Sequence, residues 1–435
     1  MGTIESQVNT STKLKRIAFL SERDPHKQFT SLMHHFNEES LKECFYMLDG
    51  RKAVGTDGIS KEEYAKDLDE NIQRLVEKMK RMAYRPGPVR QVLIPKEGNH
   101  GATRPLGISN FEDKIVQKMM QRVLESIYEP LFLKCSYGFR PEIGCHNAIR
   151  DLQHHLYQNR VETVIDIDLA NYFGSIDVKL LEKMLRTKIK DEKIMRYIIR
   201  MFKAGVLADG ELTISEEGMI TQGSCASPVL ANIFAHYVLD EWIEKDVKPR
   251  CAGQVWLCRY ADDGVICCQF EKDAIRIRKA LGKRLARFKL KLNEEKTKLV
   301  DFRKIAGKRA AFNFLGFTHY LGKSKNGYII PKLKTIGKRL RLKLKAVKDW
   351  IRIAKNRMEL AEIWKRFCLK LQGHINYYGV SHNCRQVRIF IAQATKIMFK
   401  WLNRRSQRNS FNWEQFQLFI KANPLPMAKR HHKLF

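Results

Sequence analysis

The stretch LCRYADDGVICC, residues 257–268, predicts the hairpin around which this chain is built. The apolar segments 255–258 and 265–268 have the length and composition of β-strands, and Ala-Asp-Asp-Gly between them supplies turn residues. The pattern therefore places two carboxylates, Asp262 and Asp263, at the tip of a β-hairpin. Adjacent carboxylates repel each other, so such a tip is either simply solvated or neutralised by a divalent cation. Asp-Asp-Gly alone is ordinary turn chemistry, and the rest of the chain has to decide between these two interpretations.

A second acidic segment, VIDIDL at residues 164–169, alternates strictly between polar and apolar residues. On a strand this period places Asp166 and Asp168 on one face and the aliphatic residues on the other. Such a D-x-D strand also occurs in metal-dependent glycosyltransferases, so this motif alone leaves the reaction class open. If the strand and the hairpin are neighbours in one sheet, Asp168, Asp262 and Asp263 converge. Three such carboxylates can hold two Mg²⁺ ions about 3.5–4 Å apart, an arrangement that serves nucleotidyl transfer.

The charge of the chain is concentrated in its last third. The formal net charge is +33, and residues 301–435 contribute 31 Lys and Arg against five Asp and Glu. A solvated basic surface is the simpler explanation of such a composition, but so one-sided a distribution favours a surface that binds the phosphates of a nucleic acid.

Compartment and redox state follow from what the sequence does not contain. No apolar run has the length of a membrane helix, and the polar first residues are unlike a signal peptide, so we expect a protein of the cytoplasm, in bacteria the cytosol or nucleoid, that does not bind membranes. The ten cysteines form no C-x-x-C pair and no cluster with zinc-ligand spacing, which predicts reduced, buried thiols and no zinc-dependent endonuclease.

Hydrophobic periodicity and turn residues predict the other elements. Helical spacing covers 38–82, interrupted by a loop at 55–58, and also 115–128 and 273–289. Another helix begins with Ser227 as N-cap and Pro228 at the first helical position and ends before Pro249. Strands are expected at 89–95, before a bend at 96–98, and at 312–317. Three amphipathic helices with basic outer faces, at 336–351, 360–371 and 387–401, predict a three-helix bundle.

These motifs together resemble those of the bacterial group II intron reverse transcriptases that carry a maturase domain, over nearly the whole chain. The order and spacing of the matching segments carry the resemblance: Ile94-Pro95-Lys96, Arg104-Pro105-Leu106-Gly107-Ile108, Tyr137-Gly138-Phe139-Arg140-Pro141, Asp166-Ile167-Asp168-Leu169, Gln222-Gly223 with Ser227-Pro228-Val229-Leu230-Ala231-Asn232, Tyr260-Ala261-Asp262-Asp263, Leu315-Gly316-Phe317 and Gly373-His374-Ile375-Asn376-Tyr377-Tyr378-Gly379.

The resemblance implies an α+β right-hand polymerase fold, with fingers and a palm built on an antiparallel sheet, followed by an all-α basic thumb or maturase bundle. The implied domains are an N-terminal extension and fingers (1–110), a palm with the remaining fingers, the metal site and the primer grip (111–320), a thumb (321–402), and a basic DNA-binding-like tail (403–435). No endonuclease domain of the H-N-H type is expected after this tail.

The resemblance also implies roles for individual residues. Asp168, Asp262 and Asp263 would be the catalytic ligands of two Mg²⁺ ions, with Asp262 bridging both and Asp166 only supporting them. Lys296 would protonate the leaving pyrophosphate. Phe173 would be a steric gate that excludes the ribose 2′-OH and so favours dNTPs, although without the resemblance it is best explained as a core aromatic.

Further residues would bind substrates. Lys96 and Arg104, which flank one glycine-bearing turn, would contact the triphosphate, although surface cations are most often only solvated. Gln222 and Gly223 would border the template and the nucleotide, and Leu315, Gly316 and Phe317 would grip the primer end.

The expected activity is therefore RNA-directed DNA synthesis by two-metal nucleotidyl transfer, with an RNA template, a DNA primer and dNTPs, together with binding of a group II intron RNA and of target DNA for splicing and retrohoming. The sequence departs from the family pattern at Gly174, Thr221, Ser224 and Gly264, none of which is a metal ligand. Two alternatives stay open: an RNA-binding splicing cofactor with a vestigial polymerase, and a free-standing or defence-associated reverse transcriptase.

Overall fold

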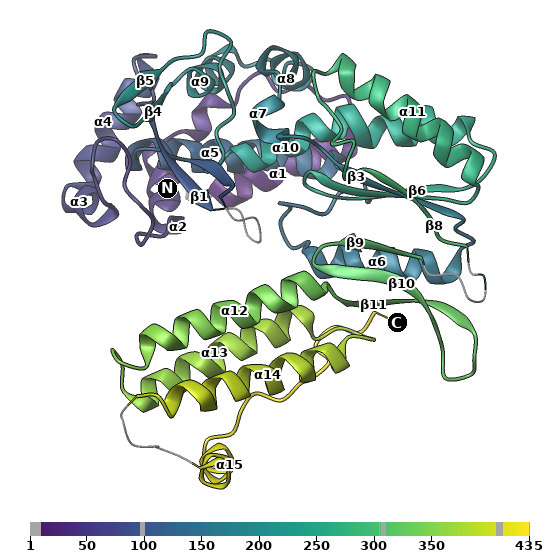
Figure 1. The fold of residues 1–435 in the computed structure, drawn as a ribbon. Helices are drawn as coiled ribbons and strands as arrows, with labels where there is room; N and C mark the ends of the chain where they lie inside the picture. The colour runs from purple at the N-terminus through teal and green to yellow at the C-terminus, as the bar shows by residue number, and fades with distance from the viewer. Residues whose placement is uncertain (1–9, 96–100, 304, 306–309, 406–411, 435) are drawn as a thin grey trace, which may run out of the picture. The chain divides into compact units, whose positions relative to one another are not determined.

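The computed structural model describes residues 10–95, 101–303, 305, 310–405 and 412–434 of the chain (Figure 1). The chain divides into two units, the first made of residues 1–144, 167–266 and 272–297, and the second of residues 145–166, 267–271 and 298–435. Each unit is assembled from segments far apart in the sequence, so neither corresponds to one continuous stretch of chain.

The first unit is mainly helical. Its helices are α1 (Thr10–Arg23), α2 (Glu38–Met47), α3 (Lys61–Lys66), α4 (Leu68–Lys80), α5 (Phe111–Tyr128), α7 (Tyr172–Ser175), α8 (Val178–Leu185), α9 (Glu192–Phe202), α10 (Ser227–Ala235) and most of α11 (Glu271–Arg287). Its strands are β1 (Val89–Pro95), β2 (Thr103–Ile108), β4 (Val206–Ala208), β5 (Glu211–Thr213), β6 (Val255–Tyr260) and the start of β7 (Asp263–Cys268).

The sheet β2-β1-β4-β5 of this unit is mixed, whereas the resemblance implied fingers and a palm with an antiparallel sheet. β1 and β2 form an antiparallel hairpin, in which Ile94 lies opposite Arg104, but β1 and β4 run parallel. Parallel neighbours need a long crossover, and more than a hundred residues separate these two strands. The bend predicted at residues 96–98 lies outside the described residues.

Helix α10 differs from the prediction at both ends. Ser227 is not the N-cap: it is the first helical residue, and its hydroxyl donates to the Thr221 carbonyl at 2.8 Å. The α-helix also ends at Ala235, and the chain continues as the π-helical turns η3 (His236–Asp240) and η4 (Trp242–Val247) instead of one α-helix up to Pro249. π-helical turns shift the side chains out of α-helical register, and such turns are frequent at functional sites.

The second unit contains α6 (Cys145–Gln158), most of β3 (Thr163–Asp168), β8 (Lys298–Asp301), β9 (Ala311–Phe314), β10 (Phe317–Lys323), β11 (Ile329–Thr335), α12 (Gly337–Ala354), α13 (Leu360–Tyr378), α14 (Cys384–Leu402) and α15 (Trp413–Ala422). Strands β9, β10 and β11 form an antiparallel sheet. The single strand predicted at 312–317 is wrong, because Leu315 and Gly316 adopt positive φ angles of 46° and 83° and turn the chain between β9 and β10.

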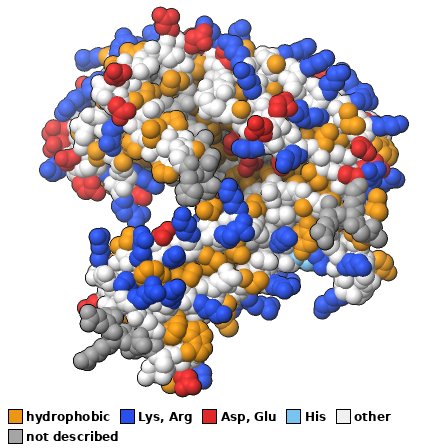
Figure 2. Space-filling model, viewed as in Figure 1, with side chains coloured by type: hydrophobic (Ala, Val, Ile, Leu, Met, Phe, Trp, Pro, Cys, Tyr) orange, Lys and Arg blue, Asp and Glu red, His pale blue; other side chains and the backbone are white. Residues whose placement is uncertain are grey.

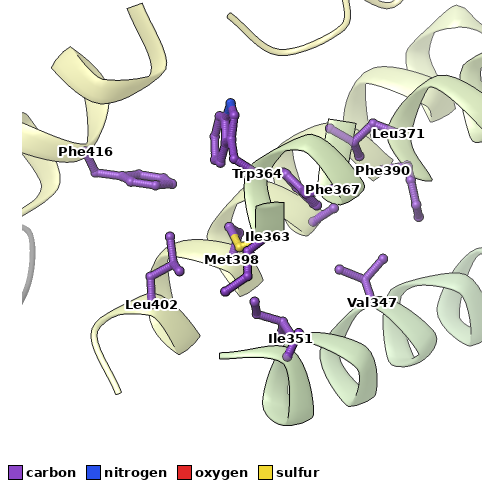
Figure 3. Close-up of a cluster of buried hydrophobic side chains, with 12 residues drawn as sticks. Val347, Ile351, Ile363, Trp364, Phe367, Leu371, Phe390, Met398, Leu402 and Phe416 are labelled. Atoms are coloured by element: carbon purple, nitrogen blue, oxygen red, sulfur yellow. The ribbon is translucent and has the colours of Figure 1, made fainter. Parts of the chain in front are cut away.

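The three predicted amphipathic helices are confirmed as α12, α13 and α14, which run side by side (Figure 1). Their apolar faces, together with α15, enclose one core of large side chains, drawn in Figure 3. Phe367 and Phe416 are fully buried in this core. In the part of the chain that the structure describes, no helix is both long and apolar enough to cross a membrane.

Because Phe367 lies fully inside this core, we predict that Phe367→Ala lowers the free energy of unfolding by about 3–5 kcal/mol, since apolar burial is reduced and a cavity remains. The matched control is Leu369→Ala on the same helix, where the side chain is 63% exposed and the expected change is within about 0.5 kcal/mol. Urea unfolding followed by circular dichroism measures both. Equal effects of the two substitutions would contradict the burial of Phe367.

Candidate active site

The predicted acidic hairpin is present and tighter than expected. The strands β6 and β7 extend beyond the predicted apolar segments 255–258 and 265–268 towards the turn. Only Ala261 and Asp262 therefore lie between the two strands. Ala261 adopts a left-handed φ of 57°, which is uncommon for a residue with a Cβ. The turn thus places Asp262 at its tip and Asp263 as the first residue of β7, with both residues exposed.

Asp168 is the last residue of β3, and its strand lies next to β7 in the sheet order β6-β7-β3-β8. A Cβ built on Gly264 would lie 3.6 Å from the Ile167 side chain, which places the two strand ends in contact. The predicted alternation is confirmed, since Ile165 and Ile167 are buried whereas Asp166 and Asp168 are only partly so. Asp168 and the aspartates of the turn therefore lie at neighbouring strand ends.

Lys296 is brought to Asp168 by the segment that follows α11. Backbone hydrogen bonds join Asn293 N to the Asp168 carbonyl at 2.8 Å and Ala170 N to the Lys291 carbonyl at 2.9 Å, so this segment runs along the end of β3. The ammonium Nζ of Lys296 lies 2.8 Å from Asp168 Oδ2. This hydrogen bond, with the charges of the three aspartates, raises the pKa of Lys296, which is therefore protonated at neutral pH.

The charge state of Asp262 reflects a crowded acidic site. Desolvation by the surrounding atoms and then the negative charge of Asp168 raise the pKa of the Asp262 carboxyl, while Arg259 and Lys296 oppose this shift. Within the described residues, no group of three or more His, Cys, Asp or Glu side chains is arranged closely enough to hold a metal ion. The charge of Asp168 thus acts on Asp262, and the ammonium group of Lys296, which is paired with Asp168, feels the charges of all three aspartates.

The hairpin is held by Arg259, a residue whose role the sequence did not predict. This side chain is 1% exposed, and its guanidinium forms a doubly hydrogen-bonded ion pair with Asp240, at 2.7 Å (Nε to Oδ1) and 2.6 Å (Nη2 to Oδ2). It also donates to the Asn232 side chain, the Ser136 hydroxyl and the carbonyl of Ala261 in the turn itself. The sequence does contain one sign of this role: Arg259 stands inside an otherwise apolar strand. A charged side chain in such a position needs a buried partner.

The loop that contains Tyr137 and Gly138 packs against the same turn. Arg259 N donates to the Cys135 carbonyl at 2.7 Å, and Tyr137 N donates to the Arg259 carbonyl at 2.9 Å. A Cβ on Gly138 would lie 2.3 Å from Ala261 N, so no other residue fits at 138 without moving the turn. The backbone of this loop and the tip that bears Asp262 are therefore fixed relative to each other.

The residues expected to contact the nucleotide occupy a second loop and a strand. Gly107 N in β2 donates to the Gln222 carbonyl at 2.6 Å, and Gly223, with a φ of 116°, lies so close that a Cβ would come within 2.2 Å of the Gly107 carbonyl. Arg104 lies on the same strand and is exposed. Phe173 belongs to the single turn α7 and is partly buried. Lys96 lies outside the described residues.

In the second unit, the expected primer-grip residues form the tight turn between β9 and β10. The hydroxyl of Tyr377 on α13 donates to the Leu315 carbonyl at 2.9 Å. The ring of Phe317 is buried and lies nearly parallel to that of Tyr377, with centroids 5.9 Å apart. Gly316 combines its positive φ with little free space, because a Cβ there would lie 3.1 Å from Arg339 Nη1.

Among the described residues, Asp240 is the acidic side chain that pairs with Arg259, so we predict that Asp240→Ala leaves an uncompensated buried charge and lowers the free energy of unfolding by about 3–5 kcal/mol. The matched control is Asp246→Ala, which removes the exposed pair with Arg250 and is expected to cost no more than about 0.5 kcal/mol. Thermal or urea unfolding compares the two variants, and equal destabilisation would show that the buried pair is not important for stability.

Comparison with known proteins agrees with this geometry. Residues 94–319 match the family described as reverse transcriptase (RNA-dependent DNA polymerase). Protein YkfC of Escherichia coli (strain K12) is 34% identical over 281 residues, which cover 58% of this chain and 73% of that protein. The group II intron-encoded protein LtrA of Lactococcus lactis subsp. cremoris is 33% identical over 235 residues, 54% of this chain and 38% of LtrA. An uncharacterized 91 kDa protein in the cob intron of Schizosaccharomyces pombe is 38% identical over 175 residues, 40% of this chain and 21% of that protein.

The chain thus spans well under half of the two intron-encoded relatives, but most of YkfC. The matched residues include all four side chains of the acidic site, Asp168, Asp262, Asp263 and Lys296. The chain belongs to the reverse transcriptases, the RNA-dependent DNA polymerases, as its sequence motifs predicted, and part of it is similar to a group II intron-encoded protein.

Proposed function

We propose that this chain copies RNA into DNA at the site formed by Asp168, Asp262, Asp263 and Lys296, using an RNA template, a DNA primer and dNTPs. The observation that carries the proposal is the 2.8 Å contact of the Lys296 ammonium with Asp168, at a strand end beside the turn that bears the other two aspartates. A protonated lysine among carboxylates is suited to donate a proton to a leaving pyrophosphate.

Divalent cations fit this site by the chemistry of its donors. Carboxylate oxygens are the ligands that Mg²⁺ prefers, and Asp262 lies close enough to Asp168 for the charge of one carboxylate to act on the other. We propose that Asp168, Asp262 and Asp263 hold two Mg²⁺ ions, with Asp262 shared between them. When bound, these ions would neutralise charge on the attacking and leaving oxygens of the transfer. Lys296 would then leave Asp168 and turn towards the pyrophosphate.

We propose substrate-binding roles for further residues, on the basis of the family resemblance and of the contacts that hold their segments in place. Arg104, with Lys96, would hold the triphosphate, and Gln222 with Gly223 would line the template and nucleotide, because the loop that carries them is hydrogen-bonded to the strand of Arg104. Phe173 would be the gate against the ribose 2′-OH. The turn Leu315-Gly316-Phe317, braced by Tyr377, would hold the primer end.

We further propose that the chain has right-hand polymerase architecture, with fingers within residues 1–110, a palm within 111–320, a thumb formed by the bundle within 321–402 and a DNA-binding tail from 403. The support for the thumb is charge: seven exposed Lys and Arg side chains project from α12, at positions 338, 339, 341, 343, 345, 348 and 352. Figure 2 shows Lys and Arg side chains gathered over this helix. Such a surface would bind the phosphates of a structured group II intron RNA and so assist splicing and retrohoming.

The catalytic proposal predicts that Asp168→Asn or Asp262→Asn lowers primer extension on an RNA template by at least about 100-fold, because each change removes a carboxylate charge that would hold the divalent cations. RNA binding should be unchanged, because neither residue belongs to the bundle. Glu295→Gln, which neutralises an exposed carboxylate beside Lys296, is the matched control and should keep full activity. Undiminished extension by either aspartate variant would refute the assignment, and would favour a binding protein with a vestigial polymerase.

The thumb proposal predicts a change in salt dependence. Replacing Lys338, Arg341 and Lys345, which lie three and four residues apart on α12, by alanine should make the slope of log K against log salt shallower by about 0.7–0.9 for each phosphate that is no longer neutralised. The control is a triple alanine variant at Lys272, Lys279 and Lys283 of α11, which removes the same charge from exposed positions in the first unit. Filter binding to a group II intron RNA measures the slopes of both triple variants. The salt concentration runs from about 50 to 200 mM, a range in which phosphate contacts strongly change the affinity. Equal slopes in the two variants would mean that α12 makes no special contribution.

A further inference from the structure

Phe139 has a conformation that its immediate packing does not explain. Its backbone φ is 57°, in the left-handed region that bulky side chains rarely adopt, and its side chain is 48% exposed. A core aromatic would be buried, and an ordinary loop residue would relax to a negative φ. Strained residues of this kind persist where the surrounding structure over-determines them, and they cluster at functional sites.

The residues just before Phe139 impose this conformation. Gly138 is held from two sides, since its carbonyl accepts a hydrogen bond from Asn232 Nδ2 at 2.6 Å and its Cα faces the Ala261 amide closely enough to exclude a Cβ. Ser136, two residues before Gly138, forms a parallel β-bridge with Arg259. The chain therefore leaves the hairpin at a fixed point, next to the turn of Asp262, and Phe139 is the first side chain beyond that point.

The ring of Phe139 contacts Phe173. Their centroids lie 6.3 Å apart at an interplanar angle of 75°, the edge-to-face arrangement that aromatic pairs prefer. Phe173 sits on α7, a single helical turn of four residues, which is anchored by the hydroxyl of Tyr172 on the Ala231 carbonyl at 2.7 Å. Tyr172 touches the same ring, at 5.8 Å and 71°. Phe139 thus supplies an aromatic contact to Phe173 from another segment of the chain.

We propose that Phe139 is a positioning residue that fixes the ring of Phe173 and thereby sets the discrimination between dNTPs and rNTPs. This inference rests on the proposed role of Phe173 as the gate against the 2′-OH. Two nucleotides that differ by one hydroxyl can be told apart sterically only if the excluding ring cannot move aside. A partly exposed Phe173 on one helical turn could otherwise rotate about χ1, and such a rotation would break its contact with the ring of Phe139. The contacts of Gly138 with Ala261 and Asn232 fix both Phe139 and the turn that bears Asp262. The proposed gate therefore has a fixed position relative to the proposed catalytic aspartates.

The test measures the ratio of kcat/KM for a dNTP to that for the matching rNTP in single-nucleotide primer extension. Phe173→Val tests the gate, and Phe139→Gly and Phe139→Tyr test the support. Glycine adopts a positive φ without steric cost, so Phe139→Gly removes the ring while relieving the backbone. We expect Phe139→Gly to keep or raise the melting temperature and to lower the dNTP preference by about 10-fold or more, within the range that a pocket of altered fit produces. Phe139→Tyr keeps the ring and should keep the preference.

The control is Phe19→Ala, which removes an exposed aromatic ring from α1 and should leave the ratio unchanged. If Phe173→Val loses the preference while Phe139→Gly retains it, the support role of Phe139 is wrong and the gate stands. If Phe173→Val itself retains the preference, the gate assignment fails, and the inference falls with it. An equal decrease of dNTP and rNTP incorporation in Phe139→Gly, with the ratio unchanged, would also overturn it.

Discussion

A guanidinium group that leaves water must recover its hydrogen bonds from the protein, and Arg259 recovers them from several segments at once. Asp240 supplies the charge, while Asn232, Ser136 and the carbonyl of Ala261 accept the other N–H groups. A buried ion pair by itself adds little stability, because desolvating two charges is expensive. Its effect here is geometric: the two-residue turn that bears Asp262 is tied directly to the guanidinium, so the turn has one position relative to α10 and to the loop of Gly138. The acidic site depends on that position.

The local parts of this structure follow from the sequence, whereas the pairings between distant segments do not. The strands around Asp262, the alternating strand of Asp168 and the helices of the basic bundle are predictable, because periodicity and turn chemistry are local properties. The contact between Lys296 and Asp168 and that between Asp240 and Arg259 join residues whose spacing carries no pattern. The family resemblance alone pointed to Lys296. The arginine inside an apolar strand indicated that Arg259 needs a buried partner, but nothing in the sequence identified Asp240 as that partner. The turn at Leu315 and Gly316 has the pattern of a strand because aromatic residues flank it on both sides.

The positions at which the sequence departs from the family pattern have mild structural consequences. At Gly264 an added Cβ would make ordinary van der Waals contact with Ile167, so the glycine leaves open space beside the strand of Asp168. Thr221 contributes its carbonyl to Ser227, a role that does not depend on the side chain. At Gly174, by contrast, a Cβ would lie 2.6 Å from the Asn171 side chain, so a larger residue there requires Asn171 to move. None of these positions is one of the four residues Asp168, Asp262, Asp263 and Lys296 of the acidic site.

The Arg259 network also has a consequence for the order in which the protein can fold during synthesis. Ser136, Asn232 and Asp240 all precede Arg259 in the chain, and Ala261 follows it by only two residues. Each of these partners of the guanidinium has therefore left the ribosome when Ala261 emerges, and domains generally fold in the order in which they are made. The turn that bears Asp262 can close on its supports before the basic helices exist, so the acidic centre is set before a large positive charge is attached to the same nascent chain.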